Sequence, residues 1–214
     1  MIDDLYKKQM DAFWDRFGRV VARTGITPNG VTLLGILLCS VNALAFTWHQ
    51  NMLAFGILVG AIELLDNVDG AVARVTGKTT LAGSYLDATT DRYKDFFILL
   101  AIAWVTGYWL ACTLAIGGSL ITSYAHARAA MLGARDDVDP AKGGKTLPDL
   151  FERLERIATL CIGLVFTPYA PEIMGHGLIF YVVWFVAIMT QVTGAQRFGR
   201  RLRQLRALDA EAQG

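Results

Sequence analysis

Four aspartates, Asp66, Asp69, Asp87 and Asp91, are the residues whose type and spacing could do chemistry in this sequence. The first two are three positions apart and the last two are four apart, so each pair would share one face of a helix. Two adjacent antiparallel helices would then point all four carboxylates into one gap. Such a cluster requires cations, and its oxygen ligands suit Mg²⁺ or Mn²⁺ rather than zinc.

Small and polar residues around these aspartates favour a phosphate ligand. Gly70 and Gly83 would let a substrate approach the backbone, and Ala73 would keep the same face open. Arg74 offers a forked donor for phosphate, and Thr80 offers a hydroxyl. Together these residues predict a pyrophosphate site, where a metal would polarise a phosphoryl oxygen and one carboxylate would act as general base.

The elements that must position this site are predicted to be membrane helices. Hydrophobic residues make up 54% of the 214 residues and charged residues 18%, whereas soluble domains carry about 25% charge. A spanning helix needs about 20 mostly apolar residues, and it satisfies its own backbone hydrogen bonds. We therefore expect an all-α integral membrane protein with six transmembrane helices, over residues 31–48, 52–75, 81–105, 108–132, 154–168 and 178–198.

Residues 1–24 predict an amphipathic helix lying on the membrane surface, before a catalytic domain over residues 25–200. Its apolar face would comprise Leu5, Met10, Phe13, Trp14, Phe17, Val20 and Val21. The first twenty residues lack a long apolar core, so no cleavable signal peptide is expected. Residues 133–149 are polar and rich in Gly and Pro, which predicts a loop. Residues 201–214 are predicted to be a basic, then disordered tail.

The placement of Lys and Arg predicts the topology. Basic residues precede the first span, follow the sixth, and lie between spans two and three and between spans four and five. The other connections, near His49, Gly107 and Pro171, contain none. The positive-inside rule then places both termini and the aspartate cluster in the cytosol. A net charge of +1 gives no indication of a nucleic-acid partner.

The segment from Asp66 to Asp91 matches the pattern D-x2-D-G-x2-A-R-x8-G-x3-D-x3-D without a gap or a substitution. This pattern resembles that of the CDP-alcohol phosphotransferases, also called CDP-alcohol phosphatidyltransferases. The six predicted spans and the amphipathic N-terminal helix are similar to that family as well, so the resemblance covers nearly the whole chain.

The resemblance implies a role for each matching residue. The four aspartates would bind two Mg²⁺ ions, with Mn²⁺ as a possible substitute, and Asp91 would deprotonate the acceptor hydroxyl. Residues 27–32, TPNGVT, resemble the TPxxVT segment of the family, which shapes the nucleotide-lipid site. The acceptor oxygen would attack the phosphate attached to the lipid, CMP would leave, and the enzyme would form a homodimer. The expected CDP-lipid-binding residues are Asn29, Thr32, Gly70, Ala73, Arg74, Thr80 and Gly83.

Four shorter segments are similar to the phosphatidylinositol-phosphate synthases of this family. Residues 86–92, LDATTDR, resemble LDATxDR, residues 123–130 resemble SYxKARAE, and residues 152–156 resemble ERPER. Residues 196–197 resemble a QR pair near the end of the last span. His126, Ala130 and Leu154 depart from these patterns, where Lys, Glu and Pro are expected. Cations here suit a phosphorylated acceptor, because Arg pairs with phosphate in a bidentate way. The expected acceptor phosphate-binding residues are Ser123, His126, Arg128, Arg156 and Arg197.

Three functions are compatible with these features. The leading one transfers lipid from CDP-diacylglycerol or CDP-archaeol to inositol 1-phosphate. A phosphatidylglycerophosphate-type synthase would use glycerol 3-phosphate instead. A divalent-cation transporter would also need membrane aspartates, but transporters place their site at the bilayer midplane between repeats. Here the cluster is predicted at one membrane face and no repeat is evident, which disfavours transport.

Overall fold

The computed structural model describes residues 13–134 and 150–213, and the regular elements there are helices apart from an isolated bridge between Ile173 and His176. Residues 13–22 form an N-terminal helix. The others are α2 (Pro28–His49), α3 (Met52–Thr76), α4 (Leu81–Thr106), α5 (Trp109–Met131), α6 (Arg153–Phe166) and α7 (Leu178–Gln213). The all-α class is confirmed, and five of the six predicted helices have bounds within three residues of those expected.

The chain divides within α4, after Ala101, into two compact units. The first unit contains the N-terminal helix, α2, α3 and most of α4. The second contains the end of α4 together with α5, α6 and α7.

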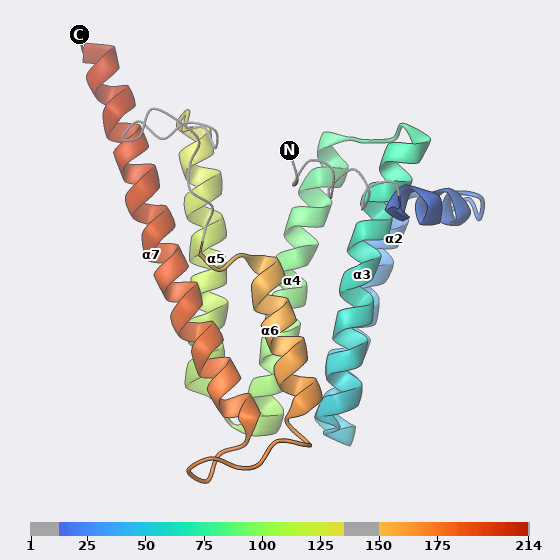
Figure 1. Cartoon of the computed structure of the whole chain (residues 1–214). Helices are drawn as coiled ribbons and strands as arrows, with labels where there is room; N and C mark the ends of the chain where they lie inside the picture. The colour runs from blue at the N-terminus through green and yellow to red at the C-terminus, as the bar shows by residue number, and fades with distance from the viewer. Residues whose placement is uncertain (1–12, 135–149, 214) are drawn as a thin grey trace. The chain divides into compact units, whose positions relative to one another are not determined.

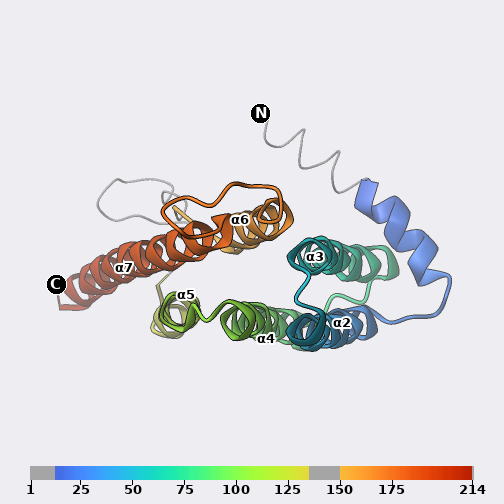
Figure 2. The ribbon, with the colours of Figure 1, turned by 90° about the horizontal axis from the view of Figure 1, so that it is seen from below.

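In the first unit, α2 and α3 pack side by side (Figures 1 and 2). The Thr27 side chain accepts a hydrogen bond from the Gly30 amide at 3.1 Å and so caps α2, and Pro28 follows in the first turn. A proline fits there because the first helical amides have no partner within the helix. α3 ends at Gly77, whose φ of 64° is the left-handed conformation that a glycine adopts without steric cost. The chain then turns into α4 through residues 77–80.

The N-terminal helix lies across α2 and α3 in Figure 1. Three residues of this helix pack against a buried apolar cluster of α2 and α3. The helix contributes Trp14, Val21 and Ala22, and the cluster consists of Val31, Val68 and Val72. Phe13, Phe17 and Val20 stay more than half exposed on the same helix. This helix therefore has one apolar face against the protein and a second one that is exposed, and its position on the membrane surface stays a prediction. Leu5 and Met10, which were predicted to extend that face, lie outside the described residues, as do residues 135–149 of the predicted loop.

In the second unit, α7 packs along α5 and also contacts α6. The Gln191 amide nitrogen on α7 donates to the Leu114 carbonyl of α5 at 2.8 Å. α6 begins with a capping box. The Glu152 side chain accepts a hydrogen bond from the Glu155 amide, and the Glu155 side chain accepts one from the Glu152 amide. The Gln191 bond thus joins α5 to α7, and the capping box fixes the start of α6.

The prediction of a disordered tail over residues 201–214 is wrong for the part that is described. α7 continues without interruption to Gln213. The segment is rich in Arg, Leu, Ala, Gln and Glu, which are strong helix formers. Arg201 and Gln204 are also buried, at 5% and 4% exposure, and the Arg201 guanidinium donates to the Gln204 side-chain oxygen at 2.9 Å. Helix propensity and these contacts together extend the helix beyond the apolar stretch.

Three helices of the described residues are long and apolar enough to cross a membrane, namely α2, α5 and α7. α3 and α4 are equally long, but they carry the aspartates and their neighbouring charges. α6 has only 14 residues, which corresponds to about 21 Å of helix against a hydrocarbon core of about 30 Å. The protein is an integral membrane protein, and the count of six spans stays a prediction.

Candidate active site

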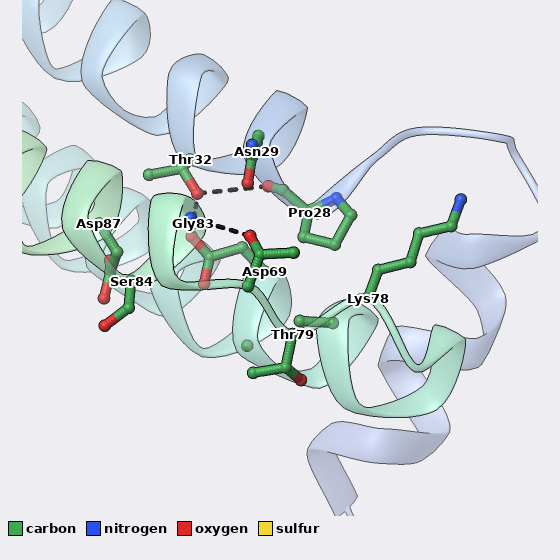
Figure 3. Close-up of a pocket in the computed structure, with 12 residues that line it drawn as sticks. Pro28, Asn29, Thr32, Asp69, Lys78, Thr79, Gly83, Ser84 and Asp87 are labelled. Carbon is green, nitrogen blue, oxygen red and sulfur yellow. Dashed lines mark hydrogen bonds between the residues drawn. The ribbon is translucent and has the colours of Figure 1, made fainter.

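An open cavity of about 180 Å³ lies in the first unit, where the beginnings of α2 and α4 meet the end of α3 (Figure 3). Six of the seven expected CDP-lipid-binding residues line it, together with two of the four aspartates. The lining residues are Pro28, Asn29, Thr32, Asp69, Gly70, Ala73, Lys78, Thr79, Thr80, Gly83, Ser84 and Asp87. Residues far apart in the sequence are thus brought together as the motif predicts.

Local capping explains how α4 presents its part of the cavity. The Thr80 hydroxyl accepts a hydrogen bond from the Gly83 amide at 3.0 Å, and the Thr80 carbonyl accepts one from Ser84 at 3.1 Å. Thr80 is therefore the N-terminal cap of α4 as well as a lining residue. One turn further along the helix, Asp87 faces the same cavity.

Asp69 is held in place from α2. It is buried, with 7% exposure, and its Oδ2 accepts a hydrogen bond from the Thr32 hydroxyl at 2.5 Å. The Thr32 hydroxyl also lies 3.2 Å from the Pro28 carbonyl of its own helix (Figure 3). Asp66 and Asp87 are near enough to interact electrostatically with Asp69. Burial of this carboxylate among other carboxylates is costly unless cations offset their charge.

Asp66 and Asp91 share a different partner, which is the amino group of Lys94. The Lys94 Nζ lies 3.1 Å from Asp91 Oδ1 and also pairs with Asp66 Oδ2. Lys94 lies three residues after Asp91 on α4, so the two side chains point in the same direction. The pairing with Asp66 of α3 therefore joins the two helices that carry the aspartates.

The aspartates fit a divalent metal in their chemistry and charge. Their donors are all carboxylate oxygens, which are the ligands of Mg²⁺ and Mn²⁺. The Lys94 ammonium between Asp66 and Asp91 is a stand-in cation, and it indicates that this pair attracts positive charge. Among the residues that the structure describes, no three acidic, His or Cys side chains are already grouped closely enough to hold an ion. Loading the site with metal therefore requires the carboxylates to converge further.

Arg74 is the one expected donor-site residue that does not line the cavity. Its guanidinium pairs with Asp15 of the N-terminal helix, with Nη2 and Nε at 3.0 and 3.1 Å from Asp15 Oδ1. A Cβ atom added to Gly70, which lines the cavity, would nevertheless lie 3.5 Å from Arg74 Nη1. Arg74 therefore borders the cavity. Its expected contact with a phosphate stays a prediction.

The expected acceptor residues lie in the second unit, and two of them, Arg197 and His126, take part in contacts between α5 and α7. Arg197 Nη1 donates to the Thr122 carbonyl at 3.4 Å. One turn further, Arg201 Nη2 lies 2.9 Å from His126 Nδ1. Because a guanidinium only donates, His126 Nδ1 accepts this bond, and its Nε2–H is the group that can donate to a ligand. A third expected residue, Ser123, follows Thr122 on α5 and donates to the Ser119 carbonyl at 3.0 Å.

The other two expected acceptor residues differ in their surroundings. Arg156 is buried in α6, at 3% exposure. Arg128 is exposed on α5. Their expected contact with an acceptor phosphate is a prediction, as it is for Ser123, His126 and Arg197.

Four residues of potential functional importance were missed from the sequence. Lys78 and Ser84 line the cavity, Lys94 contacts two of the aspartates, and Arg201 contacts His126. Lys94 had a sequence signal, because a lysine within a predicted membrane span, three positions after an aspartate, is a charge that needs a partner. Arg201 had a weaker one, as it follows Arg197 by one helical turn.

Comparison with known proteins identifies relatives along nearly the whole chain. The archaetidylinositol phosphate synthase of Pyrococcus horikoshii is 34% identical over 185 residues, which cover 86% of this chain and 87% of that protein. The phosphatidylinositol phosphate synthase of Mycobacteroides abscessus is 31% identical, with 82% of this chain and 77% of that protein covered.

Solved structures agree with the sequence relatives. The crystal structure of Mycobacterium tuberculosis phosphatidylinositol phosphate synthase with CDP-DAG bound has a TM-score of 0.75 at 26% identity, covering 88% of this chain and 92% of that one. The same enzyme in complex with manganese and citrate has a TM-score of 0.76 at 27% identity, covering 88% of both chains. The CDP-alcohol phosphatidyltransferase family matches residues 25–193, and together with the complete aspartate motif this match establishes that the chain belongs to that family.

Proposed function

We propose that this enzyme transfers the phosphatidyl or archaetidyl group of a CDP-linked lipid to a hydroxyl of inositol 1-phosphate and releases CMP. The cavity of the first unit carries this proposal, because it combines the expected donor-binding residues with Asp69 and Asp87. The related synthases, whose names specify inositol phosphate lipids, support the choice of product. The structure of a relative with CDP-DAG bound supports the choice of donor.

The chemical step is a displacement at phosphorus. The acceptor hydroxyl oxygen forms a bond to the phosphorus that carries the lipid, and the bond from that phosphorus to the oxygen of CMP breaks. Asp91 takes the proton of the hydroxyl, and CMP leaves with the bonding electrons as a phosphate oxyanion. The hydroxyls and amides around Thr80 and Gly83 orient the pyrophosphate so that the leaving group lies opposite the attacking oxygen.

Asp66, Asp69, Asp87 and Asp91 are the proposed metal ligands. Mg²⁺ or Mn²⁺ bound there supplies electrostatic stabilisation of the charge on the phosphoryl oxygens and on the departing CMP. The manganese complex of a relative supports a divalent ion in this family. We propose two ions, in accordance with the number of carboxylates available.

The second unit is proposed to recognise the phosphate of the acceptor. Arg197 and Arg201 approach α5 at positions one turn apart, beside Ser123 and His126. Arg128 and Arg156 are the further cations proposed for this role. A phosphorylated acceptor suits several guanidinium groups better than a neutral alcohol does.

The proposed topology has six spans, with both termini and the active site in the cytosol. The distribution of Lys and Arg supports this orientation. The charge of α3 and α4 then faces the protein interior and the aqueous end of the bundle, not lipid. A homodimer, which the family resemblance implies, also stays a prediction.

The test is CMP release by the purified enzyme in detergent with CDP-diacylglycerol and Mg²⁺. Inositol 1-phosphate, glycerol 3-phosphate, free inositol and serine are compared as acceptors, and an ether-linked CDP-archaeol is tested as an alternative donor. Release with inositol 1-phosphate is expected to be fastest. Faster release with glycerol 3-phosphate would refute the proposed acceptor, while no metal-dependent release with either donor would refute the proposed reaction.

Replacing Gly83 by valine is expected to raise the KM for the CDP-lipid by roughly tenfold, because binding energy in the cavity is lost. A side chain at this position would begin 3.1 Å from Thr80 Oγ1 and 3.2 Å from Asn29 Oδ1, and its methyl groups would enter the cavity. Initial rates at varied CDP-lipid measure this effect. The matched control is Gly117→Val on α5, where an added Cβ meets open space. An equal change in KM in the two variants would contradict the assignment of the cavity.

A further inference from the structure

Lys94 has an unusual position for a lysine. Its side chain is fully buried, with 0% exposure, and its ammonium lies between Asp66 of α3 and Asp91 of α4. Those two side chains are themselves only 16% and 18% exposed. A buried ammonium is stable only where nearby negative charge compensates for the lost hydration. Lys94 and the aspartate pair therefore depend on each other in the metal-free protein.

The benefit to the aspartates follows from the charges around them. Asp69 interacts electrostatically with both Asp66 and Asp87, and Glu63 adds a further negative charge near Lys94. Like charges on two facing helices push those helices apart unless a cation lies between them. Within the described residues, Lys94 is the cation that contacts both Asp66 and Asp91. It thus joins the middle of α3 to the middle of α4, where the repulsion between the aspartates would otherwise separate them.

The same contacts oppose metal binding. Asp91 Oδ1 and Asp66 Oδ2 are oxygens that a divalent ion would use, and the Lys94 ammonium is already bound to both. An ammonium and a divalent ion cannot share these oxygens at contact distance without strong repulsion. The lysine stem is flexible, with four methylene groups, so the ammonium can withdraw when an ion enters.

We propose that Lys94 is a resident counter-cation of the metal site: it holds Asp66 and Asp91 together when no metal is bound, and a divalent ion must displace it from them. This inference rests on the proposed function in one respect, namely that the four aspartates bind the ion. Lys94 is accordingly a positioning residue, which sets how tightly the enzyme holds its metal.

The test replaces Lys94 by methionine, which keeps the length of the side chain and removes its charge. Mn²⁺ should bind roughly tenfold more tightly to Lys94→Met than to the wild type, because the competing cation is gone. In EDTA the variant should melt roughly 6–12 °C below the wild type, because uncompensated carboxylates remain. Saturating Mn²⁺ should remove most of this difference. Electron paramagnetic resonance of free Mn²⁺ measures the affinity, and intrinsic fluorescence measures Tm, so neither readout depends on turnover.

Two control variants make the result specific. Arg92→Met removes a cation two residues away on the same helix, whose guanidinium lies 3.6 Å from Asp95. It should leave the Mn²⁺ affinity unchanged. Asp87→Asn removes a proposed ligand and should weaken Mn²⁺ binding. Lys94→Gln, which can still donate hydrogen bonds to both aspartates, is a second uncharged variant that is easier to fold than Lys94→Met.

The outcomes separate this proposal from the proposed function. Folding of the Lys94 variants only when Mn²⁺ is present would support the proposal in its strongest form. Unchanged or weaker Mn²⁺ binding in both variants would overturn it and leave the metal site in place. It would also be overturned if neither variant folded even with Mn²⁺, since an ion could not then replace the ammonium. If the wild type bound no Mn²⁺ at all, both the metal-dependent function and the role of Lys94 would be wrong.

Discussion

Replacing Asp91 by asparagine is expected to lower kcat for CMP release by roughly 10³-fold, in the range that a general base contributes. The amide cannot accept the proton of the acceptor hydroxyl, and it is a poorer ligand for a divalent ion. The fold should survive, because asparagine has the same shape and Lys94 keeps its other partner, Asp66. Single-turnover CMP release with saturating donor and acceptor measures the chemical step, and a thermal melt verifies the fold.

The matched control for this variant is Asp95→Asn. Asp95 lies one turn after Asp91 on α4, is buried at 3% exposure and pairs with Arg92 at 3.6 Å. It has no place among the proposed ligands, so its replacement should affect Tm more than kcat. A kcat for Asp91→Asn within tenfold of the wild-type value would exclude Asp91 as the base.

Replacing Asp69 by asparagine is expected to weaken Mn²⁺ binding by more than roughly 100-fold, which exceeds the usual cost of removing a partner outside the ligand shell. Asp69 is buried at the cavity, where its charge is the property that attracts an ion. Asparagine can still accept the hydrogen bond from Thr32, so the contact between α2 and α3 should persist. Mn²⁺ titration followed by electron paramagnetic resonance measures the loss, and CMP release should fall in parallel.

Thr32→Val is the companion variant for Asp69, because valine has nearly the shape of threonine and lacks the hydroxyl. It removes the 2.5 Å hydrogen bond and leaves the carboxylate charge in place. Mn²⁺ affinity should fall by roughly 10- to 100-fold, less than in Asp69→Asn, since the carboxylate is then free to rotate. Equal losses in the two variants would mean that orientation of Asp69, and not its charge, controls metal binding.

Most of the cavity lining could be predicted from the sequence because its residues lie on regular helices. The three- and four-residue spacings of the aspartates place them on helix faces, and Asn29, Thr32 and Gly83 do line the cavity with Asp69 and Asp87. Helix bounds were predicted well because the long apolar stretches that a spanning helix needs are visible in the sequence. Family membership, which rests on spacing and residue type, was confirmed by the comparisons.

Contacts between distant segments could not be predicted from the sequence. The pairing of Arg74 with Asp15 joins residues 59 positions apart, and periodicity contains no information on which charges meet. The same applies to Lys94 with Asp66 and to Arg201 with His126, because both depend on how two helices pack. The helical tail was missed for another reason. The basic and polar composition of residues 201–214 predicted disorder, whereas Arg201 and Gln204 are buried and stabilise the helix.

The division of the chain within α4 has a consequence for how such enzymes can diversify. All of the residues proposed for donor and metal binding precede Ala101, and all of those proposed for acceptor recognition follow Ile102. Inherited changes that alter the choice of alcohol can therefore accumulate in one half without disturbing the reactive chemistry in the other. Recombination at α4 between relatives with different acceptors is a direct route to a new polar headgroup made by the same transfer reaction.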